Sequence, residues 1–336
     1  MAIPHPSHFL KCFIPLALLI MSVPGSAAVF NVTSSWCTGP NSIVEAIDNA
    51  NASPGVDTIS IQAGLAIQFR TCPITNKAAY AGYVQESVII EGNGATLQGD
   101  QSWVSLGGVL NPEGCPSKIS GVIIVNTSPG FLSIGNKRAD NSAIKVIVNN
   151  LTASDLSAFA QVYEAAQLEV NDVHLIDIQD ALGSCSRSAI DGYQGSSISI
   201  VDSTVYNFRN YGNSLLKNIW NATLANYDGS VYVRGSHFSK GVAGIPGGAL
   251  ISTSSDVTVV SSRFENAGGF SFLGSADAPT QVSIVNSAIQ IFGAPETTDR
   301  IYASFYSDVD IKASTIVSIF GTTATGPPGD SKTMPL

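Results

Sequence analysis

A short pattern of apolar and polar positions returns along most of the chain. It is clearest between Val231 and Phe320, where it reads apolar, any, apolar, any, any, Ser, any, apolar. The four clearest copies cover residues 231–238, 257–264, 282–289 and 309–316. Apolar residues at alternate positions turn one face of a strand toward a core and the other toward solvent. Each copy therefore predicts a short strand, a corner and a second strand.

The residues in the middle of each copy are those that turns favour, such as Asp202-Ser203, Gly235-Ser236 and Asn286-Ser287. A second apolar run precedes each copy, as at 249–251 and 301–305. Several strands and corners in a unit of about 25 residues make one turn of a solenoid. If the turns stack, one column must hold five serines: Ser203, Ser236, Ser262, Ser287 and Ser314.

Weaker copies begin earlier in the chain, at Ile59, Val88, Val122, Val146, Leu168 and Ile198. Successive copies are roughly 22 to 34 residues apart, a range typical of solenoid repeats. Val, Ile, Ser and Thr dominate, and the consensus of leucine-rich repeats is missing. We predict an all-β protein, a parallel β-helix solenoid of about ten coils. It should be right-handed, because crossovers between parallel strands nearly always are.

An amphipathic helix is expected before the first coil, over residues 42–51. Asn41 or Ser42 can cap it, and Glu45 stands where a carboxylate reaches back in a capping box. Its apolar stripe consists of Ile43, Ala46, Ile47 and Ala50. Because the open end of a solenoid exposes a dry core, we predict that this helix covers it. The predicted parts are a cap at 29–56, a β-helix at 57–320 and a flexible tail at 321–336.

Residues 1–28 have the features of a secretory signal peptide. Lys11 supplies a positive charge, and residues 13–23 form an apolar run too short to span a bilayer. Small residues at Ser26-Ala27-Ala28 suit a cleavage site, which predicts a mature start at Val29. An uncleaved membrane anchor is the alternative. No later stretch is long and apolar enough to span a membrane, so we expect the mature protein to be secreted or held at the cell surface. We also expect it to be a monomer.

Four cysteines follow the predicted signal, and an even number in an exported chain suggests two disulfides. Order along a solenoid favours Cys37–Cys72 and Cys115–Cys185 among the three possible pairings. Metal binding is the alternative, but there is no CxxC pair and no nearby histidine. The formal net charge of −9, without a basic patch, argues against nucleic acid as a partner.

The segment from Cys37 to about Gly99 carries motifs of a known family. The matching residues are Cys37, Ser42–Ile47, Asn51, Pro54-Gly55, Asp57–Ile59 and Ile89–Leu97. They resemble the two signatures of CSLREA-type secreted bacterial β-helix proteins. Here four residues separate Cys37 from the Ser42 string, and Val44 stands where arginine is usual. The resemblance implies export and a pectin-lyase-like fold, and it implies no activity because the family has no agreed catalytic residues.

Asp172 and Asp202 occupy matching corners of successive predicted coils, and stacking would place them about 4.8 Å apart. Two carboxylates at that distance could share a proton, bind calcium or act as a retaining glycosidase pair. The structural alternative is that corner Asp and Asn residues bond the local backbone, as Asn150 and Asn286 at the same place suggest. We favour the structural role and expect no cofactor, with calcium as the candidate exception.

A second group of candidates lies between two predicted coils: Asp177, Asp180, Arg187 and Asp191. Carboxylates near one arginine could clamp a sugar acid or a calcium ion, and the alternative is a solvated loop with ordinary ion pairs. The pectin-hydrolase motifs Asn-Thr-Asp, Asp-Asp, Gly-His-Gly and Arg-x-Lys are absent. His174 and His237 stand at outward strand positions, which favours a surface role.

Aromatic residues gather in the middle coils, and the carbohydrate-binding candidates are Tyr193, Tyr206, Tyr211 and Trp220. Sugars pack on such rings, although stacked cores use aromatic side chains too. The sequence favours a non-enzymatic, adhesin-like module that binds polysaccharide or a cell-surface glycan. One alternative is a polysaccharide lyase or glycoside hydrolase that acts on acidic polysaccharide, and another is a passenger fragment of a larger exported protein.

Overall fold

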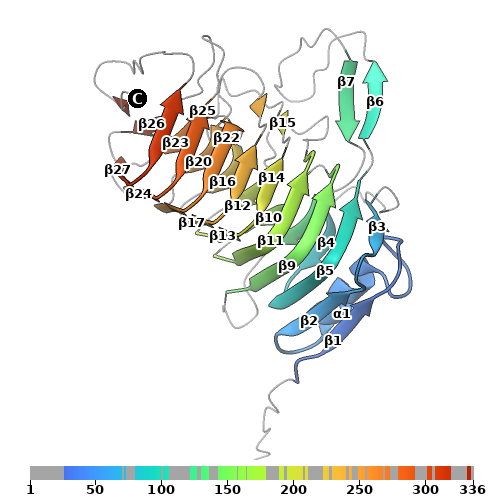
Figure 1. The fold of residues 1–336 in the computed structure, drawn as a ribbon. Helices are drawn as coiled ribbons and strands as arrows, with labels where there is room; N and C mark the ends of the chain where they lie inside the picture. The colour runs from blue at the N-terminus through green and yellow to red at the C-terminus, as the bar shows by residue number, and fades with distance from the viewer. Residues whose placement is uncertain are drawn as a thin grey trace, which may run out of the picture.

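The computed structural model describes most of the repeating region and the segment before it. The described residues are 26–69, 72, 80–99, 101–105, 122–126, 130–135, 143–156, 158–163, 165–178, 189–192, 195–206, 209–210, 222–226, 229–239, 242–243, 249–253, 256–267, 269–272, 279–291, 301–304, 307–318 and 331–333. They form an all-β solenoid of mostly parallel strands with one short helix. Figure 1 shows the strands stacked in chain order along the axis.

The first half of the repeated pattern forms one row of parallel strands in a 16-stranded sheet. The row consists of β2 (Asp57–Ile61), β5 (Val88–Gln98), β9 (Lys145–Ser154), β11 (Gln167–Ile176), β13 (Ser197–Val201), β17 (Ser230–Arg234), β21 (Asp256–Val260), β24 (Thr280–Val285) and β27 (Ser307–Lys312). The register aligns the first apolar positions, such as Leu168 with Ile198 and Val231 with Val257. These side chains are buried, as the alternation predicts.

The second half of the pattern continues the same sheet past the corner. β5, β9 and β11 run through the corner, whereas in other coils a separate strand begins there. These strands are β3 (Ala66–Gln68), β14 (Thr204–Tyr206), β18 (His237–Ser239), β22 (Arg263–Ala267), β25 (Ala288–Ile291) and β28 (Thr315–Ser318). Phe238 of β18 stacks on Phe264 of β22 with ring centroids 4.9 Å apart.

The apolar run that precedes each pattern forms the second sheet. Its strands are β4 (Tyr80–Val84), β8 (Gly130–Ile134), β10 (Ala160–Val162), β12 (Ile190–Gly192), β16 (Ala222–Asn226), β20 (Ala249–Thr253), β23 (Gly269–Phe272), β26 (Ile301–Ser304) and β29 (Ser331–Thr333). All pair in parallel except β29, which lies within the predicted tail and pairs antiparallel with β26. Both sheets contribute to one buried apolar cluster. A short parallel pair, β15 (Arg209–Asn210) and β19 (Val242–Ala243), lies outside the two sheets.

The corner between the two rows has a left-handed backbone in successive coils. Positive φ values of 47° to 59° occur at Asn150, Asp172, Asp202, Gly235, Ser261, Asn286 and Ala313. Asp and Asn tolerate this conformation because their short polar side chains bond locally. Gly235 is also needed for space, since a Cβ there would lie 2.1 Å from Asp202 Oδ1. The predicted alignment of Asp and Asn residues at one corner is confirmed.

The residue after each of these corners points inward, and the predicted serine column is confirmed. Each serine Oγ accepts the backbone N–H of the preceding coil, in five bonds of 3.1 to 3.3 Å that start at Val173. Each Oγ also donates to the carbonyl two residues earlier, at 2.7 to 2.9 Å. We call these five residues the serine ladder: Ser203, Ser236, Ser262, Ser287 and Ser314. It supplies hydrogen bonds for backbone groups that the corner leaves unpaired.

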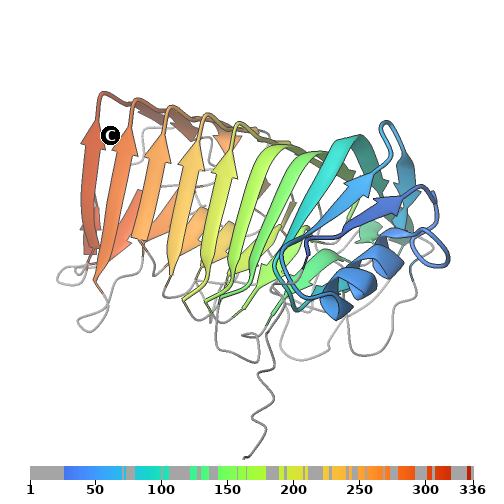
Figure 2. The same cartoon turned by 90° about the horizontal axis from the view of Figure 1, so that it is seen from below.

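The N-terminal end is covered by β1 (Val29–Val32) and the helix α1 (Ile43–Ala52) (Figure 2). The Glu45 N–H donates to Ser42 Oγ at 3.2 Å, and the Asn41 N–H donates to Glu45 Oε2 at 2.5 Å. The four residues of the predicted apolar stripe are those that the helix buries. α1 packs against β1, β2 and β4. The sequence therefore predicted both the helix and the face that it buries.

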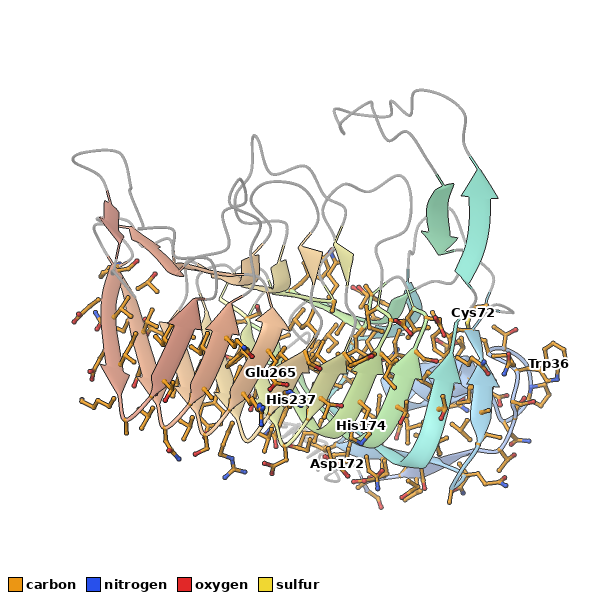
Figure 3. The ribbon with its side chains drawn as sticks, turned by 45° about the horizontal axis from the view of Figure 1, so that its top comes forward. Trp36, Cys72, Asp172, His174, His237 and Glu265 are labelled. Atoms are coloured by element: carbon orange, nitrogen blue, oxygen red, sulfur yellow. A yellow bond between two sulfur atoms is a disulfide. The ribbon has the colours of Figure 1, made fainter. Side chains whose placement is uncertain are left out.

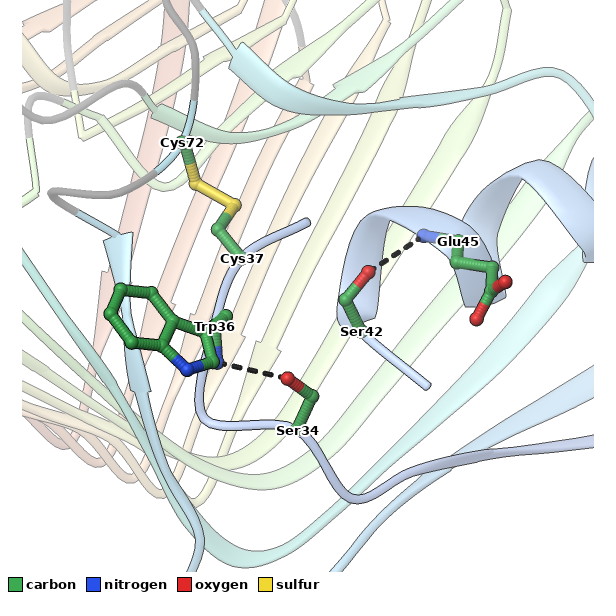
Figure 4. The surroundings of a disulfide bond; sticks show 6 residues. All are labelled: Ser34, Trp36, Cys37, Ser42, Glu45 and Cys72. Carbon is green, nitrogen blue, oxygen red and sulfur yellow. Dashed lines mark hydrogen bonds between the residues drawn. A yellow bond between two sulfur atoms is a disulfide. The ribbon is translucent and has the colours of Figure 1, made fainter. Parts of the chain in front are cut away.

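A disulfide joins Cys37, just before α1, to Cys72, which follows β3 in the chain (Figure 4). This predicted pairing is confirmed. The other predicted pair, Cys115 and Cys185, lies outside the described residues, as do residues 1–25 of the predicted signal. Within the described part of the chain, no helix has the length and apolar character needed to cross a membrane.

The coil predicted at Val122 is wrong. β7 (Val122–Asn126) pairs antiparallel with β6 (Gln101–Ser105), and β5 pairs directly with β9 instead. Figure 1 shows this pair standing apart from the stack. β-branched residues favour strands in general, so their presence does not determine which strand is the pairing partner. The start of the first coil is also shifted by two residues, because Asp57 rather than Ile59 aligns with Val88.

Candidate functional site

The two corner aspartates are exposed, stand at equivalent positions of adjacent coils, and each has a basic side chain nearby. His174 Nε2 lies 4.0 Å from Asp172 Oδ1, and Arg234 Nη2 lies 3.8 Å from Asp202 Oδ2. Among the described residues, no three His, Cys, Asp or Glu side chains gather where they could hold a metal ion. Both aspartates have the left-handed backbone of the corner, with φ of 52° and 48°, and the choice between the structural role and a calcium site stays a prediction.

The second group of candidates is divided between the two sheets. Asp177 follows β11 at a corner with φ of 53°, and its N–H donates to the Tyr206 carbonyl at 3.0 Å. Asp191 lies in β12 of the second sheet. Asp180 and Arg187 lie outside the described residues. The same holds for three of the aromatic candidates, Tyr193, Tyr211 and Trp220, whereas Tyr206 is 38% exposed at the end of β14.

The two histidines stand on the outer surface of the first sheet (Figure 3). His174 Nδ1 lies 2.7 Å from Thr204 Oγ1, and His237 Nε2 lies 3.1 Å from Glu265 Oε2. Glu265 also accepts a hydrogen bond from Arg263. The bond from Arg263, and then that from His237, hold the pKa of Glu265 below its ordinary value. His237, Arg263 and Glu265 form a partly exposed polar network, and such surface contacts contribute little to stability.

A different set of residues is aligned by the backbone register of the second sheet. The register aligns Tyr83 of β4 with Ser133 of β8, Gln161 of β10 and Asp191 of β12. Ser133 and Gln161 are partly exposed, and their neighbours along each strand are buried. We call these four residues the Tyr83 column. It brings one sequence-predicted candidate, Asp191, into line with three residues that the sequence did not single out.

Two tyrosine rings close over a glycine beside this column. A Cβ built on Gly135 would lie 3.3 Å from Tyr83 Cε2 and 3.3 Å from Tyr163 Cδ2. The Tyr163 N–H donates to the Ile134 carbonyl at 2.8 Å, and the Gly135 N–H donates to the Val84 carbonyl at 3.3 Å. These backbone bonds fix the positions from which the rings extend. Tyr83 is 42% exposed, so part of the aromatic surface faces solvent.

The helical cap fixes the strand that carries Tyr83. Asn51 Nδ2 donates to the Tyr83 carbonyl at 2.7 Å, and its Oδ1 accepts the Gln85 N–H at 2.7 Å. Gly82 leaves room for the helix, since a Cβ there would lie 2.4 Å from Ile47 Cδ1. One Asn side chain thus bonds the backbone groups on both sides of Val84, as a neighbouring strand would. The cap therefore both covers the core and positions the candidate site.

The sequence contains a signal for this site that aromatic density alone did not reveal. A tyrosine directly follows the last residue of three strands in the second sheet: Tyr163 after β10, Tyr193 after β12 and Tyr227 after β16. The strand ends Val162, Gly192 and Asn226 are aligned by the register. Tyr193 and Tyr227 themselves lie outside the described residues. The alignment of coils reveals that the strand ends before these tyrosines are equivalent.

The chain matches no protein-family model, and no curated protein sequence matches it either. The CSLREA-type resemblance of the segment from Cys37 to Gly99 therefore stays a prediction.

Proposed function

We propose that this protein is a secreted or cell-surface β-solenoid that binds a glycan without catalysis, through the Tyr83 column and the Tyr163 ring. The observation that carries the proposal is the pair of tyrosine rings over Gly135, one of them 42% exposed. Aromatic rings supply an apolar face and a polar hydroxyl, a combination that suits sugars. The side chains of Ser133 and Gln161 offer hydrogen-bond partners for sugar hydroxyl groups.

The charge of this surface favours an uncharged glycan. Ser133 and Gln161 carry no charge, and the residue at the next register position, Asp191, is acidic. The formal net charge of the chain is −9. A polyuronate would be repelled by such a surface, since like charges disfavour association. Successive coils also repeat about every 4.8 Å, which provides an extended row of contacts for a polymer.

The proposed export and architecture are supported by the N-terminal region. The capping helix and the Cys37–Cys72 disulfide suit an exported solenoid, because disulfides persist in oxidising compartments. We propose the right-handed form, with about ten coils when β1 is counted as a coil of its own. Membership of the CSLREA-type proteins is part of the same proposal and is supported by the residues between Cys37 and Gly99.

A glycan array tests the binding proposal with three proteins: the wild type, Tyr83→Ala and Tyr206→Ala. The two tyrosines are similarly exposed, at 42% and 38%, but Tyr206 lies on the first sheet. We expect the wild type and Tyr206→Ala to bind the same neutral glycans. Tyr83→Ala should bind about tenfold more weakly, because one aromatic contact contributes about 1.4 kcal/mol. Equal binding by all three proteins would refute the site.

The enzymatic alternative is tested by incubating the wild type with polyuronates, with and without calcium. A lyase or hydrolase would release unsaturated or reducing sugars and would lose this activity in Asp191→Ala. Such products would overturn the non-enzymatic proposal. We expect none, because Asp177 follows β11 of the first sheet whereas Asp191 lies in β12 of the second sheet.

A further inference from the structure

Asp57 is a charged residue in an apolar column. The register places it where the following coils have Val88, Val146 and Leu168. It is 0% exposed, as are the aliphatic side chains of Ile59 and Ile61 on the same strand. A buried carboxylate is strongly destabilising unless a partner compensates its charge and its hydrogen bonds. The position therefore needs a cationic or multiply donating group.

The group that lies against Asp57 is the backbone nitrogen of Ala28. The Ala28 N–H donates to Asp57 Oδ1 at 2.7 Å. The other oxygen, Asp57 Oδ2, is buried without a hydrogen-bond partner in the described structure. The Ala28 carbonyl accepts the Thr58 N–H at 2.8 Å, and β1 begins with the next residue. Both the N–H and the carbonyl of Ala28 therefore form hydrogen bonds with β2, the strand that carries Asp57.

A peptide nitrogen satisfies this carboxylate only in part. It offers one donor and no charge, whereas an α-ammonium group at the same place offers three donors and a positive charge. An ammonium at Ala28 could reach both carboxylate oxygens and neutralise the buried charge. Breaking the peptide bond before Ala28 creates such a group without moving the nitrogen.

We propose that the mature chain begins at Ala28, one residue before the start that the sequence pattern predicts, and that its α-ammonium pairs with Asp57. The inference rests on the proposed export, because a host signal peptidase would perform the cleavage. Water adds across the Ala27–Ala28 bond, so that Ala27 leaves with a carboxylate and Ala28 keeps an ammonium. Ala27 and Gly25 supply the small residues one and three positions before the cut.

Cleavage at the neighbouring bonds fits the structure less well. A start at Val29 would remove both the nitrogen that bonds Asp57 and the carbonyl that accepts the Thr58 N–H. The buried Asp57 carboxylate would then lose the hydrogen bond from the Ala28 nitrogen. A start at Ala27 or earlier would keep an uncharged amide at Ala28. Only the Ala27–Ala28 cut gives a positive charge to the nitrogen that contacts Asp57 Oδ1.

N-terminal sequencing and intact mass of the exported protein test the cleavage site. The full chain is expressed in a host that secretes proteins, and the product is collected outside the cell. We expect a start at Ala28. A start at any other residue overturns this inference alone, whereas an exported or retained chain that keeps its first residues overturns the proposed signal as well. Glycan binding is measured separately, so failure of that proposal remains distinguishable.

A stability measurement tests the ion pair itself. Chains that begin at Ala28 are prepared with a free or an acetylated N-terminus, because acetylation keeps the N–H and removes the charge. We expect the free form to unfold at a higher urea concentration than the acetylated form. The difference should disappear in Asp57→Asn, and it should be absent in a matched pair of chains that begin at Ala27. An equal effect of acetylation with and without the Asp57→Asn substitution, or no effect at all, would overturn the pairing.

Discussion

The first coil and the middle coils of this solenoid bury polar groups in different ways. In the middle coils, the serine ladder repeats one arrangement from Ser203 to Ser314, each hydroxyl serving its own coil and the preceding one. At the N-terminal end, the polar groups are met by features that occur once each: the capping box of α1, the Asn51 bridge and the Ala28–Asp57 contact.

The difference follows from the number of neighbours. A middle coil has a similar coil on each side, so one side chain at an equivalent position satisfies groups in both, and repetition is sufficient. The first coil lacks a preceding coil, and its exposed edge and core must be covered by other elements. Terminal coils therefore depend on particular residues, whereas middle coils depend on a pattern. Four variants test this difference between the first coil and the middle coils.

Removing the disulfide at the N-terminal end should have the largest effect. Cys37 and Cys72 close a loop with a sequence separation of 35 residues. A crosslink of that length lowers the entropy of the unfolded chain and stabilises the fold by about 4 kcal/mol. We expect Cys37→Ala/Cys72→Ala to lower the free energy of unfolding by about that amount, measured by urea denaturation. If this variant lost less free energy of unfolding than Ser236→Ala, the idea that the N-terminal end depends on single features would be contradicted.

Breaking one step of the serine ladder should have the next largest effect. Ser236→Ala leaves the buried Ser203 N–H without the acceptor that now lies at 3.1 Å. An unsatisfied buried donor costs about 1 to 3 kcal/mol. The matched control is Ser283→Ala, because Ser283 occupies an outward, partly exposed position of β24. Ser236→Ala should unfold at a lower urea concentration than Ser283→Ala, with a free energy of unfolding that is lower by about 1 to 3 kcal/mol. Equal midpoints would mean that the serine ladder does not stabilise the fold.

Loss of the helix cap should have a smaller and more local effect. Ser42→Ala removes the oxygen that accepts the Glu45 N–H at 3.2 Å. Loss of an N-cap side chain costs about 1 kcal/mol. Hydrogen exchange should show faster exchange of the first amides of α1, while the amides of β17 keep their rates. Uniform acceleration across both elements would indicate global rather than local destabilisation.

The smallest effect should come from Glu169, which lies in the polar row on the outside of β11. Hydrogen bonds from Asn171 and then from Lys145, whose Nζ lies 3.0 Å from Oε2, lower the pKa of Glu169 below its ordinary value of 4.5. Because the pKa is lower in the folded state, the stabilisation is complete above pH 4.5 and is lost as the pH falls through the folded value. The side chain is partly exposed, so the contribution should stay below about 1 kcal/mol.

Glu169→Gln tests this contribution by denaturation at several pH values. The variant should be slightly less stable than the wild type at pH 7, and the two should converge as the pH falls below 4.5, the ordinary value of the pKa. A difference that persists unchanged at low pH would show that packing, rather than the charge of Glu169, is responsible.

Local periodicity in the sequence determined much of this molecule. Alternate apolar residues set which face of each strand is buried, and short polar residues marked the left-handed corners. The stripe from Ile43 to Ala50 determined the helix and its buried face, and order along the chain favoured the Cys37–Cys72 pair. The strand faces, the corners and the helix depend on residues that are close in sequence or equivalent by repeat, so a pattern reveals them, whereas the disulfide was one of three possible pairings.

The tertiary structure alone decided where the stacking departs from the repeat. Val122 begins a β-branched run like the others, yet its strand pairs with β6, because β-branched residues favour a strand without specifying its partner. The stacking of β4, β8 and β10 brings Tyr83 and Tyr163 together over Gly135. The pairing of β1 with β2 places Asp57 against Ala28. Periodicity assigns a residue to a face, but only the packing of successive coils decides what lies beside it.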